Sequence, residues 1–182
     1  MIMTVEELRK FIKTDDSDEC LEAKLAGIEQ QIRNFTHNNF QVRGDGIVAD
    51  VVAGVFMSEA LIPFEPGDTI QISGSDKNDG LYTVAEVTDD TTFTVNEKTR
   101  DEIDVFATLV RYPADIKLGV VNMMTWELEN RQKAGIESET ISRHTVNYIN
   151  LDAWNSNMGY PDSLTQFLRP YMRSRFGRGI GG

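Results

Sequence analysis

The 182-residue chain has 29 acidic and 18 basic residues, a formal net charge of −11, and 40% hydrophobic residues. This composition is ordinary for a globular protein with a sizeable core. The negative charge excludes broad neutralisation of nucleic-acid phosphates, although a negative wall would still let DNA slide past. No apolar run approaches the roughly twenty residues of a membrane-spanning helix. The single cysteine, Cys20, excludes an internal disulfide framework and fits a reducing compartment.

Two helices are expected before residue 40. Thr4-x-x-Glu7 has the spacing of a capping box and predicts a short helix from Thr4 to about Lys13. A second helix is expected over residues 16–37, because apolar residues there repeat at spacings of four and three. These are Leu21, Leu25, Ile28, Ile32 and Phe35.

Residues 41–112 have a different pattern, with short runs of β-branched and aromatic residues between Gly and Asp turns. Asn78-Asp79-Gly80 and Asp89-Asp90 predict hairpin turns. Five or six strands over this length indicate a small antiparallel barrel or sandwich, SH3-like or OB-like. The segment has 14 acidic and 5 basic residues, a charge of −9, whereas the rest of the chain has 15 and 13, a charge of −2.

Helical pattern returns at Pro113, which suits the first position of a helix. The helix that follows is apolar over most of its girth until about Leu128, which indicates packing on more than one side. Residues 136–160 are polar and show one strand-like stretch at 145–151. Pro161 is expected to begin a last helix, and the chain ends in a basic, Gly-rich segment, residues 173–182.

Few residues suit catalysis or metal binding. His37 lies at a predicted helix end, and His144 lacks acidic or Cys neighbours at ligand spacing. The acidic run 15–19 does not continue as a calcium loop, since its sixth and twelfth positions hold Cys20 and Ala26. We therefore expect a protein that is not an enzyme and has no catalytic residues, no metal site and no cofactor.

Interaction surfaces remain, and two are candidates. Met123, Met124 and Trp126 on the apolar helix either pack inside the chain or form a contact between subunits. The basic C-terminal region is either a solubilising tail or a docking segment that orders on its partner. Its candidate docking residues are Arg169, Tyr171, Arg173, Arg175, Phe176 and Arg178.

Several segments resemble the head–tail connector, or adaptor, proteins of long-tailed bacteriophages. They are Thr4-Val-Glu-Glu-Leu-Arg-Lys-Phe-Ile-Lys13 with the acidic run after it, Tyr112-Pro113-Ala-Asp-Ile-Lys117 leading the apolar helix, Gly135-Ile-Glu-Ser-Glu-Thr-Ile141, and Tyr160-Pro161 through Tyr171. The matches cover about 110 residues in order on both flanks, and each is a loose hydrophobic pattern. Residues 41–111 depart from the short members of that family, which run almost directly from the second helix to the Tyr-Pro turn.

The resemblance implies an α+β fold class: a helical adaptor core of about four helices with an inserted small antiparallel β-domain. Residues 1–40 with 113–182 would be the helical domain, and 41–112 the acidic insertion. It also implies a ring, twelvefold in the family, at the head–tail junction of the virion, assembled in the host cytoplasm.

The same resemblance implies the partners of the ring. It would dock on the portal protein through residues 164–182, with Met123, Met124 and Trp126 as candidate contacts between its subunits. It would present a surface to the next neck or tail-completion protein and pass double-stranded DNA without sequence-specific binding. No membrane is involved. For the acidic β-domain we expect an outward position rather than a place in the channel.

Two alternatives belong to other classes of protein. A ligand- or carbohydrate-binding β-module could use the helices as a handle, since barrel mouths are common ligand sites. The β-region offers few aromatics for sugar stacking, namely Tyr82, Phe93 and Phe106 at strand positions, and it has no tryptophan. A hydrolase that uses a carboxylate pair is the third reading, supported only by scattered acids.

Overall fold

A computed structural model describes residues 1–130, 138–141, 144–147 and 156–174. The chain forms two compact units. One unit, here the barrel unit, contains Met1 and residues 39–112; the other, here the flanking unit, contains residues 2–38 and 113–182.

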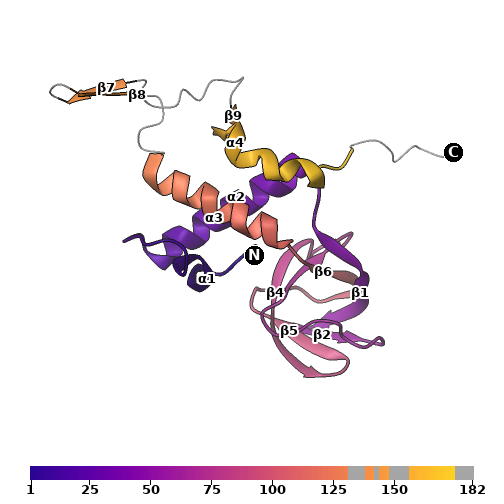
Figure 1. Cartoon of the computed structure of the whole chain (residues 1–182). Helices are drawn as coiled ribbons and strands as arrows, with labels where there is room; N and C mark the ends of the chain where they lie inside the picture. Colours follow the sequence, from indigo (N-terminus) through magenta and orange to yellow (C-terminus); the bar gives the residue numbers. More distant parts are fainter. Residues whose placement is uncertain (131–137, 142–143, 148–155, 175–182) are drawn as a thin grey trace. The chain divides into compact units, whose positions relative to one another are not determined.

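The barrel unit is a closed antiparallel β-barrel in which the strands follow the order β1-β2-β5-β4-β3-β6 (Figure 1). The first and last strands pair with each other, so no strand of the barrel has a free edge. The strands are β1 (Gln41–Val52), β2 (Val55–Ser58), β3 (Thr69–Ile72), β4 (Gly80–Asp89), β5 (Thr92–Val95) and β6 (Glu102–Val110).

Two-residue and Gly-containing turns set the register of the hairpins. Ala53 and Gly54 join β1 to β2 with φ angles of 53° and 84°, the left-handed values that a tight hairpin turn with the strand twist requires. Asn78-Asp79-Gly80 leads into β4, which pairs with β3, and Asp89-Asp90 turns β4 into β5. Both predicted hairpin turns are confirmed.

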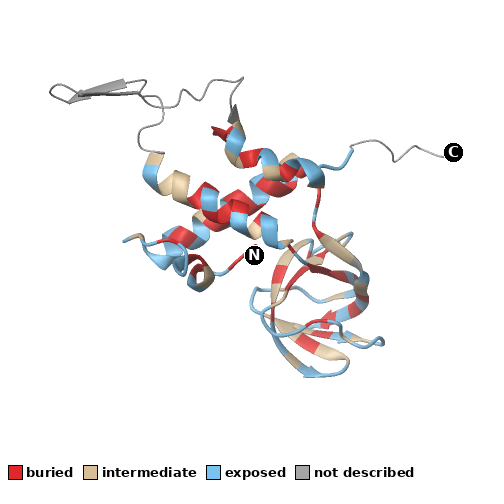
Figure 2. Cartoon of the chain, in the orientation of Figure 1, coloured by how far each residue is buried: buried red, intermediate tan, exposed pale blue. Residues whose placement is uncertain are grey.

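Side chains fill the inside of the barrel. Along β1, Ile47, Ala49 and Val51 are buried while the residues between them are exposed, the alternation of a strand with one face on the core (Figure 2). Phe93 stacks on Phe56 at 4.6 Å between ring centroids. The core cluster consists of Ile47, Ala49, Val51, Phe56, Phe64, Ile70, Ile72, Tyr82, Val84, Phe93, Val105, Ala107 and Leu109.

A polar cluster fixes the loop between β3 and β4. The Glu102 carboxylate accepts hydrogen bonds from the Ser75 hydroxyl at 2.7 Å and from the backbone N–H groups of Asp76 and Lys77 at 2.7 and 3.2 Å. The buried Asn78 side chain also donates to Glu102, at 2.7 Å, and to the carbonyl of Arg100. These donors favour the charged carboxylate and hold the pKa of Glu102 below its usual value.

The chain enters and leaves the barrel through adjacent residues. The rings of Phe40 and Tyr112 lie 4.8 Å apart, and the backbone N–H of Arg111 donates to the carbonyl of Phe40 at 3.0 Å. Phe40 has a φ of 53°, which is uncommon for a bulky residue, and it is 6% exposed. The burial and the ring contact therefore hold a strained backbone in place.

The flanking unit contains helices of unequal length (Figure 1). They are α1 (Val5–Arg9), α2 (Asp18–Thr36), α3 (Ala114–Asn130), α4 (Asp162–Thr165) and the 3₁₀ helix η2 (Gln166–Tyr171). The strands outside the barrel are short: β7 (Ser138–Ile141) pairs with β8 (His144–Asn147), and β9 (Ser156–Asn157) with β10 (Tyr160–Pro161).

Local chemistry explains where α2 begins and ends. The Ser17 side chain accepts a hydrogen bond from the N–H of Cys20 and caps the start, while His37 closes the end with a left-handed φ of 50°. The predicted stripe points inward, since Leu21, Leu25 and Ile32 are at most 1% exposed. This helix is confirmed within two residues at its start and one at its end.

The expected fold class, a helical adaptor core of about four helices with an inserted small β-domain, is wrong. The described part of the chain is mostly the closed six-stranded barrel, accompanied by only a few short helices. The first predicted helix ends at Arg9 instead of Lys13. The last contains only four α-helical residues and then continues as a 3₁₀ helix with Pro170 inside it. The last helix changes type because proline has no N–H to donate to an α-helical ladder. The fold class differs because the barrel has a large core of its own.

Candidate interaction surface

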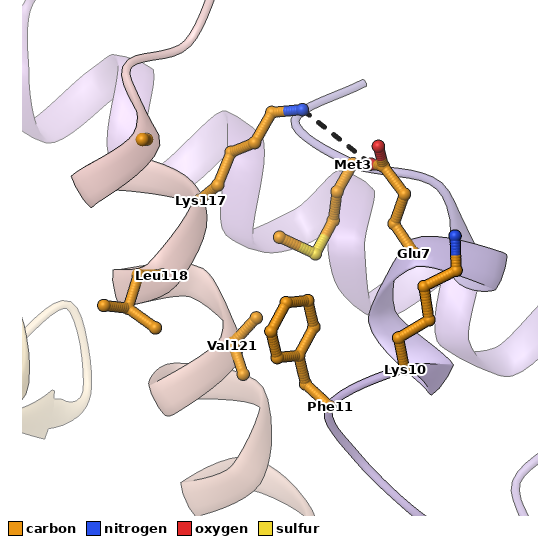
Figure 3. A pocket seen from close by; sticks show the side chains of 8 residues that line it. Met3, Glu7, Lys10, Phe11, Lys117, Leu118 and Val121 are labelled. Carbon is orange, nitrogen blue, oxygen red and sulfur yellow. Dashed lines mark ion pairs between the residues drawn. The ribbon is translucent and has the colours of Figure 1, made fainter.

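A groove in the flanking unit lies between the N-terminal segment and α3 (Figure 3). It has a volume of about 330 Å³. Figure 3 shows Phe11 lying beside Val121, with Leu118 one turn earlier on α3. The lining residues are Met3, Glu7, Lys10, Phe11, Ala114, Lys117, Leu118 and Val121; we call this set the α1–α3 groove.

A capping box positions the N-terminal wall of the groove. The Thr4 hydroxyl accepts from the N–H of Glu7 at 3.1 Å, and the Glu7 carboxylate accepts from the N–H of Thr4 at 3.2 Å. After α1 ends, the N–H of Phe11 donates to the carbonyl of Leu8 at 2.9 Å. Leu8 is fully buried, so it anchors the turn that presents Phe11 at the surface.

The groove exposes large apolar side chains above a buried floor. Phe11 is 66% exposed and Leu118 is 57% exposed, whereas Met3 and Val121 are 4% and 7% exposed. A contiguous exposed apolar surface on a soluble protein commonly marks a contact with another molecule. Leu118 is therefore the large apolar side chain of α3 that the rest of the flanking unit leaves exposed.

Charged side chains border the groove. The Lys117 ammonium lies 3.8 Å from the Glu7 carboxylate, and both side chains are nearly half exposed. An ion pair with that exposure contributes little to stability, because water screens it. An apolar centre within a polar rim is the usual anatomy of a protein–protein contact.

Met123, Met124 and Trp126, the predicted contacts between subunits, lie elsewhere on α3. Both methionines are fully buried within the flanking unit. The Trp126 ring packs edge-to-face on Tyr160 with centroids 5.3 Å apart. The two methionines therefore pack inside the flanking unit, Trp126 is half-buried, and Leu118 is the large apolar side chain of α3 that is exposed.

Three of the six predicted portal-docking residues lie in the described part of the chain. Tyr171 donates its hydroxyl to both oxygens of Asp115 at 2.8 Å, which raises the pKa of the phenol. Arg169 forms a 3.2 Å ion pair with Asp162 at the surface. Arg173 donates its backbone N–H to the carbonyl of Thr36 at 2.7 Å, and its side chain is exposed. The others, Arg175, Phe176 and Arg178, lie outside the described residues.

The remaining sequence candidates have simple structural environments. Cys20 is an exposed free thiol beside Asp16, whose pKa is lowered mainly by a 2.6 Å hydrogen bond from Lys24. Within the described residues, no group of three or more His, Cys, Asp or Glu side chains is placed to hold a metal ion. The side chain of His144 lies outside the described part. None of the described helices combines the length and hydropathy needed to span a bilayer.

No protein-family model matches this sequence, and no curated protein matches it significantly. The interaction surfaces of the chain itself therefore carry the functional argument.

Proposed function

We propose that the protein is a structural component of a tailed bacteriophage virion, a ring subunit at the junction of head and tail. In this proposal the ring docks on the portal protein, extends the DNA channel and offers an attachment surface for the next neck or tail component. The ordered resemblance of both flanks to phage adaptors supports it. The α1–α3 groove, which exposes Phe11 and Leu118, is the observation that carries it.

A ring needs two different surfaces on each subunit, because identical copies join head to tail around an axis. The α1–α3 groove is our proposal for one of these surfaces. A second copy would cover Phe11 and Leu118 and leave Lys10 and the Lys117–Glu7 pair at the rim. The acidic barrel unit would repel passing DNA if it faced the channel; we propose that it faces outward.

Sedimentation of the full-length protein over a range of concentrations tests this surface. The double variant Phe11→Ser/Leu118→Ser is expected to shift the self-association midpoint at least about tenfold upward, since about two large apolar side chains lose their burial. Leu61→Ser is the matched control, because Leu61 is 74% exposed and belongs to the barrel unit. Unchanged association of the double variant would exclude the groove as the contact.

The portal contact is tested separately. Deletion of residues 175–182, which keeps the hydrogen bond of Arg173 to Thr36, is expected to leave thermal unfolding unchanged and to weaken co-sedimentation with the portal protein of the same phage. Heads that still join tails with the shortened protein would remove these residues from the docking site.

A ligand-binding barrel receives less support. The inward positions of the strands hold side chains such as Phe56, Phe93 and Ile70, all at 0% exposure, so they occupy the space that an internal ligand would need.

A further inference from the structure

The outer face of β1, β2 and β6 combines exposed apolar side chains with carboxylates. Val48 pairs with Phe106 across β1 and β6; they are 51% and 43% exposed. On the other side of β1, Met57 pairs with Asp50 and is 45% exposed. Val48, Asp50 and Met57 line a hollow of about 410 Å³, together with Gly46, Glu59 and Asp104. Phe106 lies beside this hollow, with its ring against Gly46. We call this surface the β1–β6 face.

Two carboxylates of this face have no partner within the described part of the chain. Asp50 accepts a hydrogen bond from the backbone N–H of Asp104 at 3.0 Å. The Glu59 and Asp104 carboxylates, both on exposed residues, make no hydrogen bond or ion pair there. The charged residues that line the hollow are Asp50, Glu59 and Asp104, and no Lys or Arg is among the lining residues. The lining of the hollow is therefore negatively charged.

The aromatic ring on this face has a defined support. A Cβ atom on Gly46 would lie 2.9 Å from Cζ of Phe106, so the ring rests against the backbone of β1 at Gly46. An arginine guanidinium can stack on an aromatic ring and at the same time pair with a carboxylate through its planar fork. A lysine ammonium is a compact, strongly hydrated charge and combines these contacts less well.

We propose that the β1–β6 face binds an extended, arginine-containing segment of a partner protein. Apolar side chains of that segment would contact Val48 and Met57, while its guanidinium groups would lie between Phe106 and the carboxylates of Glu59 and Asp104. Charge complementarity selects a cationic protein segment, and the same charge excludes DNA. The proposal stands independently of the ring.

The first experiment uses the full-length protein and a fluorescent heptapeptide, Thr-Arg-Val-Arg-Val-Arg-Thr, with an all-Lys version for comparison. Saturable binding is expected at low salt. The Lys peptide is expected to bind at least about fivefold more weakly, because it loses the stacking and the fork geometry. Absence of saturable binding, or equal affinity for both peptides, would overturn the proposal.

Variants locate the binding on the protein. Glu59→Gln/Asp104→Asn is expected to weaken binding at least about fivefold, and Phe106→Leu at least about threefold, since each removes one of the two contacts of a guanidinium. Asparagine suits position 104, where φ is 56°. Glu86→Gln/Asp90→Asn removes two exposed acids elsewhere on the barrel unit and is expected to change binding less than twofold.

Two outcomes would contradict the proposal even if the peptide binds. Equal weakening by both acidic double variants would show that net charge alone attracts the peptide. Altered self-association of Phe106→Leu, with no competition from the peptide, would identify a second copy of the chain as the occupant. Thermal unfolding of each variant confirms that the fold is retained.

Discussion

The barrel unit and the flanking unit are stabilised by different kinds of contact. In the barrel, a ladder of paired strands encloses one continuous cluster of side chains, and hydrogen bonds to Glu102 fix the loop between β3 and β4. In the flanking unit, helices of 19 and 17 residues pack with much shorter elements. One of its contacts is very close: the Phe167 ring lies against Gly119 of α3. We therefore expect the barrel to tolerate surface changes and the flanking unit to be sensitive at single positions.

Replacement of Phe93 by Ala tests the barrel core and has the largest expected effect. Phe93 is fully buried, stacks on Phe56 and meets the edge of Phe64 at 5.6 Å. Its loss is expected to reduce the free energy of unfolding by about 3–5 kcal/mol through lost burial and a cavity. Chemical denaturation measures this. A change below about 1 kcal/mol would contradict the barrel core as described.

A glycine tests the flanking unit in the same way. A Cβ on Gly119 would lie only 2.2 Å from the Phe167 ring, so Gly119→Val is expected to cost about 3 kcal/mol by overpacking. Gly27, on α2, has nothing within 4 Å of its Cβ position. Gly27→Ala is the matched control and is expected to stabilise by up to about 1 kcal/mol through helix propensity. Equal effects at both positions would refute the close contact.

Acid unfolding tests the contribution of the Glu102 cluster to the stability of the barrel unit. The folded pKa of Glu102 is depressed, so its stabilisation is fully present above its unfolded pKa and is lost as the pH falls through the folded pKa. Glu102→Gln is therefore expected to lower the stability of the barrel near neutral pH and to flatten its loss below about pH 4.5. Thermal unfolding against pH measures this. Parallel curves for both proteins would exclude the cluster as the cause.

The smallest expected effect concerns the end of the flanking unit. Tyr171→Phe removes the hydrogen bonds to Asp115, which are at the surface. The expected cost is about 0.5–1 kcal/mol, since water replaces part of the interaction. Hydrogen exchange is expected to accelerate in η2 while the barrel strands are unaffected. Faster exchange in the barrel would show that the two units are energetically coupled.

Some of these features follow directly from local sequence. The stripe of α2, its Ser17 cap and the turn at Asn78-Asp79-Gly80 depend on residues close together in the chain. The sequence predicted a small antiparallel barrel or sandwich over residues 41–112, but wrongly as an insertion into a helical core. The closure of β1 on β6 joins residues more than fifty positions apart, so no local pattern contains it. It also missed the end of the α-helix at Thr165, since apolar spacing does not separate an α-helix from a 3₁₀ helix.

The candidate surfaces also depend on residues far apart in the chain, so local sequence did not predict them. The sequence showed that α3 is apolar on most of its sides. Which of these side chains are exposed depends on what the rest of the flanking unit covers: Met123 and Met124 are buried, and Leu118 is exposed. The α1–α3 groove needs Phe11, which lies beyond the end of α1 and more than a hundred residues before Leu118. No local spacing contains that contact. The acidity of the barrel unit was evident, but the pairing of Val48 with Phe106 requires the strand register.

The contact between Phe40 and Tyr112 has a mechanical consequence. Gln41 and Val110, the ends of β1 and β6 next to that contact, pair with each other at one end of the barrel. Tension that pulls the two chain ends of the barrel apart would therefore load the ladder in an unzipping geometry, in which hydrogen bonds break one after another. The ring contact and the adjacent hydrogen bond from Arg111 to Phe40 would be the first interactions to bear this load.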